Sequence, residues 1–171
     1  IEFERLAQRL GYWALMLRLG NSLIHQHMSR RGGALQTAIA WLNDQLDQRG
    51  IISLQREDGE KHHWSADACI EISFEIFEDE KEQKQLRQQY WELGIFPQGA
   101  NIPFSALGGV WKVNKLHKPN VEKIVETLDN LSLIWWDVST NTISIHDIFR
   151  EYAFMGLGKN VPKIHQRKKK K

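Results

Sequence analysis

The adjacent residues His146 and Asp147 are the pair whose types and spacing best suit ligand recognition. They follow residues 135–143, whose pattern is typical of two short strands around a polar turn, and they precede an apolar pattern at helical spacing. We expect Asp147 to cap that helix, because its carboxylate can accept backbone N–H groups at the positive end of the helix dipole. An imidazole at this junction can donate a hydrogen bond to an anionic ligand. The alternative is that His146 is a half-buried histidine that closes the strand.

Several further motifs precede this pair in a fixed order. They are Arg9–Gly20, Cys69–Phe77, Leu93–Pro97 followed by Asn101–Pro103 and Leu107–Trp111, and Leu128–Leu133. Together with Ile145-His146-Asp147 they resemble the NB-ARC proteins, which include apoptotic protease-activating factors, plant disease-resistance proteins and bacterial signalling ATPases of the STAND class. The resemblance covers nearly the whole chain. It is strongest to bacterial, particularly cyanobacterial, members that carry repeats after the switch module.

The resemblance implies a role for three residues in binding ADP or ATP. In the family the histidine that matches His146 reaches the β-phosphate of ADP and keeps the resting state closed, and residues that match Gly11 and Trp13 line the base end. Ile145 replaces the usual methionine and keeps an apolar anchor. Trp13 replaces a proline that contacts the base, so an indole could stack on adenine instead, with a free energy of ~1–3 kcal/mol per stacked base. The alternative is that Trp13 packs in the core.

A phosphate-binding loop is missing from the chain. Such a loop needs a Gly-x-x-x-x-Gly-Lys-Ser/Thr sequence, because backbone N–H groups hold the phosphates and a hydroxyl holds magnesium. The nearest sequence, Gly156–Asn160, lacks the leading glycine and the hydroxyl, and we expect Gly156 or Gly158 to end a helix there. We therefore expect no catalytic residues and no enzymatic activity. The nucleotide would be shared with an absent P-loop domain, and the resemblance implies N-terminal nucleotide-binding and C-terminal repeat domains as partners and an oligomer on activation.

Composition is that of a folded, soluble piece of a larger protein. The 171 residues are 42% hydrophobic and 26% charged, and they begin at Ile1 without a methionine. A single cysteine excludes an intrachain disulfide and favours the cytoplasm, and no apolar run is long enough to span a membrane. Residues 167–171 contribute +5 to the net charge of +2, which leaves −3 for the other residues. We expect this basic tail to be a solvated end or linker, with a nucleic-acid or membrane tether as the alternative.

The pattern of elements predicts a mainly α fold in two domains. We expect a helical subdomain over residues 1–64, with helices over 2–28 and 35–48, and a charged loop over 55–63. A winged-helix domain over residues 65–155 should follow, since three helices precede a small β-hairpin wing. Residues 156–171 would form the basic tail. No metal site is expected, because His25 and His27 point to different helix faces and His62-His63 has no cysteine nearby.

The main alternative function is a winged-helix domain that binds DNA or acts as a protein-interaction adaptor. In DNA-binding winged helices the helix before the wing enters the major groove. Here that helix, residues 121–130, carries Glu122, Glu126 and Asp129 against Lys123, and it has no arginine for guanine. Its net charge of −2 would repel phosphate, so we do not expect nucleic acid as a partner. A purely structural helical spacer is a third possibility.

Overall fold

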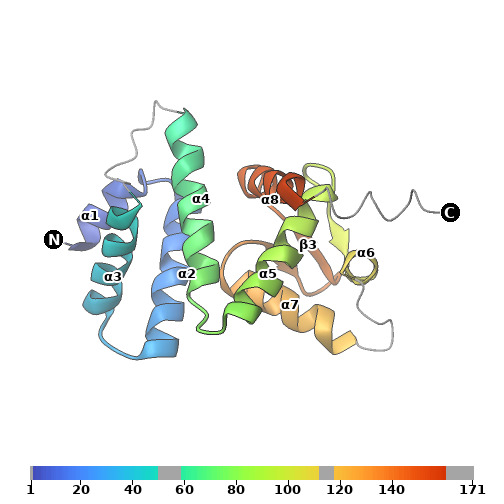
Figure 1. Ribbon diagram of the computed structural model, residues 1–171, viewed down its shortest axis with the longest axis horizontal. Coiled ribbons are helices and arrows are strands. Elements are labelled where there is room, and N and C mark those ends of the chain that lie inside the picture. The colour runs from blue at the N-terminus through green and yellow to red at the C-terminus, as the bar shows by residue number, and fades with distance from the viewer. Residues whose placement is uncertain (1, 50–58, 112–117, 161–171) are drawn as a thin grey trace. The chain divides into compact units, whose positions relative to one another are not determined.

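The computed structural model describes residues 2–49, 59–111 and 118–160, and for residues 59–65, 118, 119, 159 and 160 it describes the backbone only. Within these ranges the chain is mainly α-helical, as predicted, with one small antiparallel sheet (Figure 1). The helices are α1 (Glu2–Arg9), α2 (Ala14–Arg31), α3 (Leu35–Gln48), α4 (Gly59–Glu75), α5 (Glu80–Glu92), the 3₁₀ helix η1 (Leu93–Ile95), α6 (Phe104–Val110), α7 (Lys118–Asn130) and α8 (Asp147–Asn160). The strands are β1 (Ile102–Pro103), β2 (Trp135–Asp137) and β3 (Thr142–Ser144).

The chain divides into two compact units. The first comprises Ile1–Glu78 with Asn130–Leu133, and the second comprises Asp79–Asp129 with Ile134–Lys171. The sequence-based boundary after residue 64 therefore lies too early. The helix α4 belongs to the first unit because it packs on α2 and α3 (Figure 1). Its apolar residues are buried there, so its periodicity reflects this helical unit and not the start of the winged helix.

A tight turn divides the single helix predicted over residues 2–28 into α1 and α2. The turn passes through Gly11 and Tyr12, whose φ angles of 65° and 50° lie in the left-handed region. Glycine adopts this region without steric cost, and the Tyr12 hydroxyl hydrogen-bonds to the Glu4 carboxylate. Residues on both sides, such as Leu10 and Met16, are nevertheless buried. The apolar stripe thus continues across the turn, which is why periodicity alone did not reveal the break.

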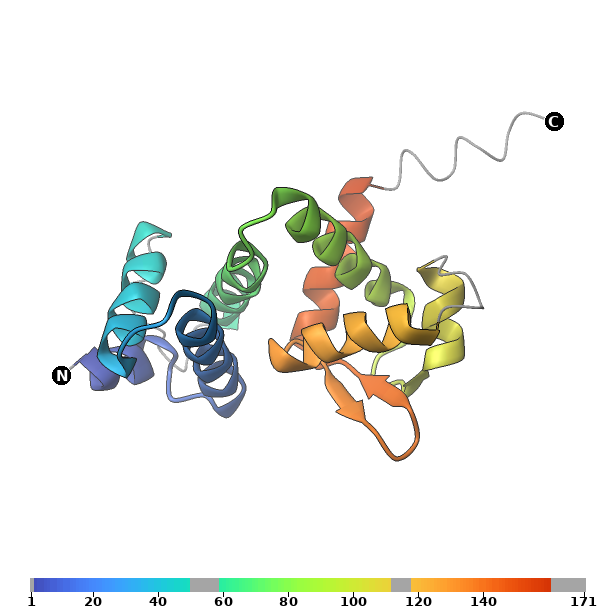
Figure 2. The same ribbon diagram turned by 90° about the horizontal axis from the view of Figure 1, so that it is seen from below.

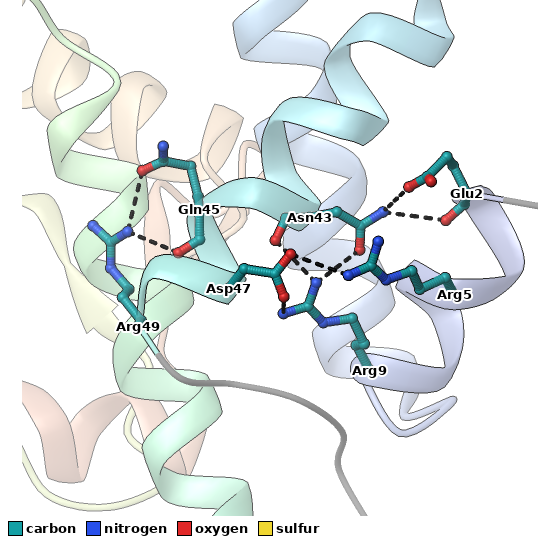
Figure 3. A network of polar contacts seen from close by, with 7 residues as sticks. All are labelled: Glu2, Arg5, Arg9, Asn43, Gln45, Asp47 and Arg49. Carbon is teal, nitrogen blue, oxygen red and sulfur yellow. Dashed lines mark hydrogen bonds and ion pairs between the residues drawn. The ribbon is translucent and has the colours of Figure 1, made fainter.

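A buried arginine fixes α1 against α3 (Figure 3). Arg9 is only 2% exposed, and its guanidinium donates to the backbone oxygen of Asn43 at 2.9 Å and to the Asn43 Oδ1 at 3.2 Å. The same group pairs with Asp47 at 2.8 Å, and Arg5 pairs with the other oxygen of Asp47 at 3.1 Å. The Asn43 amide in turn donates to the Glu2 carboxylate at 2.9 Å. The buried charge is therefore paired and hydrogen-bonded, as burial requires.

The second unit is a winged helix. The helices α5, α6 and α7 precede β2 and β3, which form an antiparallel hairpin after α7 (Figure 2). The sheet has the order β1-β3-β2, so Ile143 of the central strand pairs with Ile102 on one side and Trp136 on the other. The predicted wing is thus confirmed. The two-residue strand β1 was not predicted, because it is too short to show an alternating pattern.

Two glycines allow the chain to pack closely between α5, η1 and α8. A Cβ atom on Gly94 would lie 2.6 Å from the Phe154 Cα, and one on Gly156 would lie 2.6 Å from the Trp91 Cε2. The helix α8 continues past both Gly156 and Gly158, and neither residue has a positive φ. The predicted helix end at these glycines is therefore wrong. Gly156 serves close packing against an indole instead.

Two predicted segments need correction as a result. Residues 156–160 belong to α8, so the basic tail does not begin at residue 156, and residues 161–171 lie outside the described part of the chain. The helix α4 begins at Gly59, so the predicted charged loop over 55–63 is helical from that residue onward. Charged residues can occupy an exposed helix as readily as a loop, and composition did not separate these two cases.

Candidate functional site

The junction between β3 and α8 places His146 at the first turn of the helix. Ile145 is buried, whereas His146 is exposed. The His146 carbonyl accepts the Arg150 N–H at 2.8 Å, and its Nδ1 accepts the Ile148 N–H in a long hydrogen bond of 3.4 Å. The imidazole also lies 6.0 Å from the Phe149 ring, between centroids, in a tilted arrangement. His146 is therefore the N-cap of α8, and the helix itself orients the ring.

Asp147 has a different role from the one predicted. It is the first residue of α8, and its Oδ2 accepts a hydrogen bond of 2.6 Å from the Gln98 side-chain amide. The predicted capping role is wrong because the helix begins one residue earlier than that role requires, and an imidazole nitrogen supplies the acceptor instead. The carboxylate still lies at the positive end of the helix dipole. It links α8 to the loop that follows η1.

A second contact ties the same loop to α8. The Arg150 Nε donates a hydrogen bond of 2.6 Å to the backbone oxygen of Phe96, and the Arg150 guanidinium carbon lies 5.9 Å from the centroid of the Phe154 ring. The sequence did not predict a functional role for Gln98 or Arg150. Their partners lie 49 and 54 positions away, and no local pattern connects such positions. Only the position of Arg150, a basic residue one helical turn after His146, could have indicated its role from the sequence.

The hydrogen bond to Nδ1 determines which chemistry His146 can offer. Because Nδ1 accepts the Ile148 N–H, the neutral imidazole carries its proton on Nε2. The Nε2 atom is then a donor. The exposed ring, the first turn of α8 and the Arg150 cation lie within four residues of one another in the sequence. The imidazole donor and the N-terminus of α8 suit an anionic group such as a phosphate, and the Asp147 carboxylate in the same turn opposes it.

The other two predicted ligand residues belong to the first unit. Gly11 is buried and forms the turn between α1 and α2, and its N–H donates to the Gln8 oxygen at 3.0 Å. Trp13 is half-buried and is the N-cap residue of α2. Gly11 and Trp13 thus lie in one turn, whereas His146 lies in the second unit. A nucleotide site that combines the three residues stays a prediction.

Metal-binding clusters and membrane-spanning helices are both absent from the described residues. No group of three or more histidine, cysteine, aspartate or glutamate side chains is arranged there to hold a metal ion. None of the described helices is both long and apolar enough to cross a membrane. The glycine-containing sequence after residue 155 lies within α8, where the backbone N–H groups serve the helix and cannot form a phosphate-binding loop.

The fold and the sequence both define the second unit as a winged helix. Residues 87–152 match the sequence model of the winged-helix domain of Dark. The matched stretch covers less than half of the chain and includes Gln98, His146 and Arg150. No curated protein and no solved structure matches the chain.

Proposed function

We propose that this chain is the regulatory, nucleotide-sensing part of a STAND-class signalling ATPase, in which His146 hydrogen-bonds to a phosphate of ADP in the resting state. The observation that carries the proposal is the geometry of His146. Its Nδ1 accepts the Ile148 N–H, so its Nε2 is the nitrogen that can donate to a phosphate oxygen. The match to the winged-helix domain of Dark, a domain of apoptosome-like proteins, supports the same class.

In this proposal the chain's residues supply only part of the nucleotide site. A P-loop domain of the parent protein would supply most phosphate contacts, and Gly11 and Trp13 would line the base end. His146 would hold the winged helix in its docked position, and exchange of ADP for ATP would favour a state in which that unit moves as a rigid body. A hydrogen bond to a charged group contributes ~1.5–3 kcal/mol. Its loss would shift the equilibrium by roughly tenfold or more.

The surface of α7 disfavours the alternative of DNA binding. Glu122 and Glu126 are exposed on this helix, and Lys123 is the single cation among its described side chains. The wing, residues 135–144, carries one charged residue, Asp137. Because phosphate contacts supply most of the affinity for DNA, this surface is poorly suited to the major groove. A protein-interaction adaptor remains as the second hypothesis, and it predicts no nucleotide dependence.

The test is ADP binding measured by calorimetry with the chain joined to the P-loop domain of its parent. The variant His146→Ala should weaken ADP retention by roughly tenfold or more and should raise the resting activity of the parent. His25→Ala is the matched control, because His25 is exposed on α2, and it should leave both quantities unchanged. Unchanged ADP retention in His146→Ala would defeat the proposal. If neither the wild type nor the His146→Ala variant binds ADP, the hypothesis of a protein-interaction adaptor is favoured.

A further inference from the structure

The loop after η1 holds the start of α8 at two points. The Arg150 Nε donates to the backbone oxygen of Phe96, and the Gln98 amide donates to the Asp147 Oδ2, each at 2.6 Å. Asp147 and Arg150 are three residues apart, so they lie on one face of the helix. Both contacts therefore keep the Asp147 carboxylate on the face of α8 that meets the loop.

A tight turn presents Gln98 to this face of α8. The Ala100 N–H donates to the Pro97 oxygen at 3.3 Å, and Gly99 has a φ angle of 68°. A four-residue turn with a positive φ at its third residue has the pattern of a type II turn, and glycine adopts that angle without steric cost. Gln98 is the second residue of this turn. The turn itself therefore fixes the point from which the Gln98 side chain reaches α8.

The imidazole of His146 lies on a different face of the helix. Its Nδ1 accepts the Ile148 N–H at 3.4 Å, and its ring lies 6.0 Å from the Phe149 ring, between centroids. Successive residues of an α-helix are ~100° apart about the helix axis. The face shared by His146 and Phe149 is thus separate from the face shared by Asp147 and Arg150. The carboxylate and the imidazole are neighbours in sequence, yet different partners hold them.

This separation matters for the tautomer of His146. A carboxylate is a strong hydrogen-bond acceptor, and a cap residue lies outside the regular helix, so its ring is not restricted to helical spacing. If Asp147 were released from the loop, its carboxylate would compete for a proton on the neighbouring Nδ1. The ring would then carry its proton on Nδ1, and Nε2 would become an acceptor. An acceptor at Nε2 cannot donate to a phosphate.

We propose that Gln98 is a positioning residue that keeps the proton of the neutral His146 imidazole on Nε2, by holding the Asp147 carboxylate on the loop side of α8. This inference rests on the proposed function, because it concerns the atom that His146 offers to a phosphate. Gln98 contacts no ligand in this role and acts through Asp147. An amide suits the role, since it donates to the carboxylate oxygen without adding a charge of its own.

The test reads the tautomer of His146 by long-range ¹H–¹⁵N NMR of the full chain at about pH 8.5, where imidazoles are neutral. The signals are assigned from their absence in His146→Ala. The wild type should carry the proton on Nε2. Gln98→Ala should shift the tautomer ratio toward Nδ1 by roughly tenfold, the factor expected when a hydrogen bond to a charged group is lost. Gln98→Glu should act in the same direction, because an ionised carboxylate cannot donate to Asp147.

Two further variants separate this role from general packing of the loop. Gln85→Ala is the matched control, because Gln85 is an exposed glutamine of α5, and it should leave the tautomer ratio unchanged. The double variant Gln98→Ala with Asp147→Ala should return the proton to Nε2, since the carboxylate that Gln98 restrains is then absent. The helical circular dichroism signal should be equal in all variants, because Gln98 itself is exposed.

Three outcomes would overturn this proposal. A wild-type ring protonated on Nδ1 would contradict its starting point, and an unchanged tautomer in both Gln98 variants would show that Gln98 does not act on His146. A shifted tautomer that persists in the double variant would show that the effect does not pass through Asp147.

The tautomer is read without nucleotide, so none of these outcomes decides the proposed function. In the protein joined to its P-loop domain, Gln98→Ala should weaken ADP retention, by no more than His146→Ala does. A shifted tautomer with unchanged ADP retention would support the role of Gln98 and count against the proposed phosphate contact.

Discussion

At the scale of single residues, the atoms around two glycines of the second unit limit which substitutions these positions tolerate. Any side chain on Gly94 would collide with the backbone of α8, which cannot move without moving the helix. Gly156 is buried against the Trp91 indole, whose Nε1, Cδ1 and Cε2 atoms all occupy the space of a Cβ. Gly158 lies in the same helix but has nothing within 4 Å. The two α8 glycines therefore provide a matched pair for measurement.

We predict opposite effects for alanine at these two positions. Gly156→Ala should lower the free energy of unfolding by ~1–3 kcal/mol, because the added methyl group overpacks the site. Gly158→Ala should raise that free energy by up to about 1 kcal/mol, because alanine favours a helix more than glycine. Urea unfolding monitored by circular dichroism measures both values. Equal effects of the two substitutions would contradict the packing described for Trp91.

At the scale of elements, α2 and α3 meet at a buried histidine. His27 is 7% exposed, and its ring stacks on Trp41 at 4.3 Å between centroids. Desolvation by burial and the nearby Arg31 charge lower the pKa of His27 below its ordinary value of 6.5. The unfolded chain therefore binds this proton at a higher pH than the folded chain does. The packing of α2 on α3 is thus best at neutral and higher pH.

We predict that acid weakens the first unit through His27. The unfolded state takes up the proton as the pH falls through about 6.5, so stability declines from there until the pH lies below the folded-state pKa. His27→Leu should flatten this part of the stability profile. His25→Leu, at an exposed position of the same helix, should not flatten it. Thermal unfolding over a series of pH values provides the comparison, and identical profiles for His27→Leu and the wild type would exclude this role.

The start of α5 gives a second prediction at this scale. The Asp79 carboxylate accepts the N–H groups of Lys81 at 2.7 Å and Glu82 at 3.2 Å, so it caps the helix. Asp79→Ala should cost ~0.5–2 kcal/mol of unfolding free energy, whereas Asp79→Asn should cost almost nothing because asparagine caps equally well. Chemical denaturation distinguishes these values. A large loss in the asparagine variant would indicate that charge matters more than the cap.

At the scale of the whole molecule, a single thiol reports the opening of one unit. Cys69 is fully buried in α4, and burial raises its pKa to about 12. Because the thiolate is the reactive species, we predict that Cys69 reacts with a thiol reagent only when the first unit opens. The labelling rate should rise with urea in parallel with loss of helical signal. Labelling in native buffer at the rate of a free cysteine would contradict this burial.

Sequence patterns predicted much of the architecture because hydrophobic periodicity and turn chemistry act locally. The bounds of α3 and the wing hairpin both follow from residues close in sequence. The pattern could not show that α4 packs with the first unit, since a buried helix looks the same against either partner. It also failed at the site, where His146 replaces Asp147 as the cap and Gln98 contacts the junction from a distant loop. These features depend on tertiary contacts.

The contacts that close the second unit also determine when it can fold. Its early loop meets its last helix through Gln98 with Asp147 and Phe96 with Arg150, pairs that are 49 and 54 residues apart. During synthesis, α5 and η1 therefore leave the ribosome well before the helix that covers them. Their apolar side chains stay uncovered in that interval, and the loop-closure entropy is offset only at the end. The winged helix should thus form in one late step, once α8 is complete.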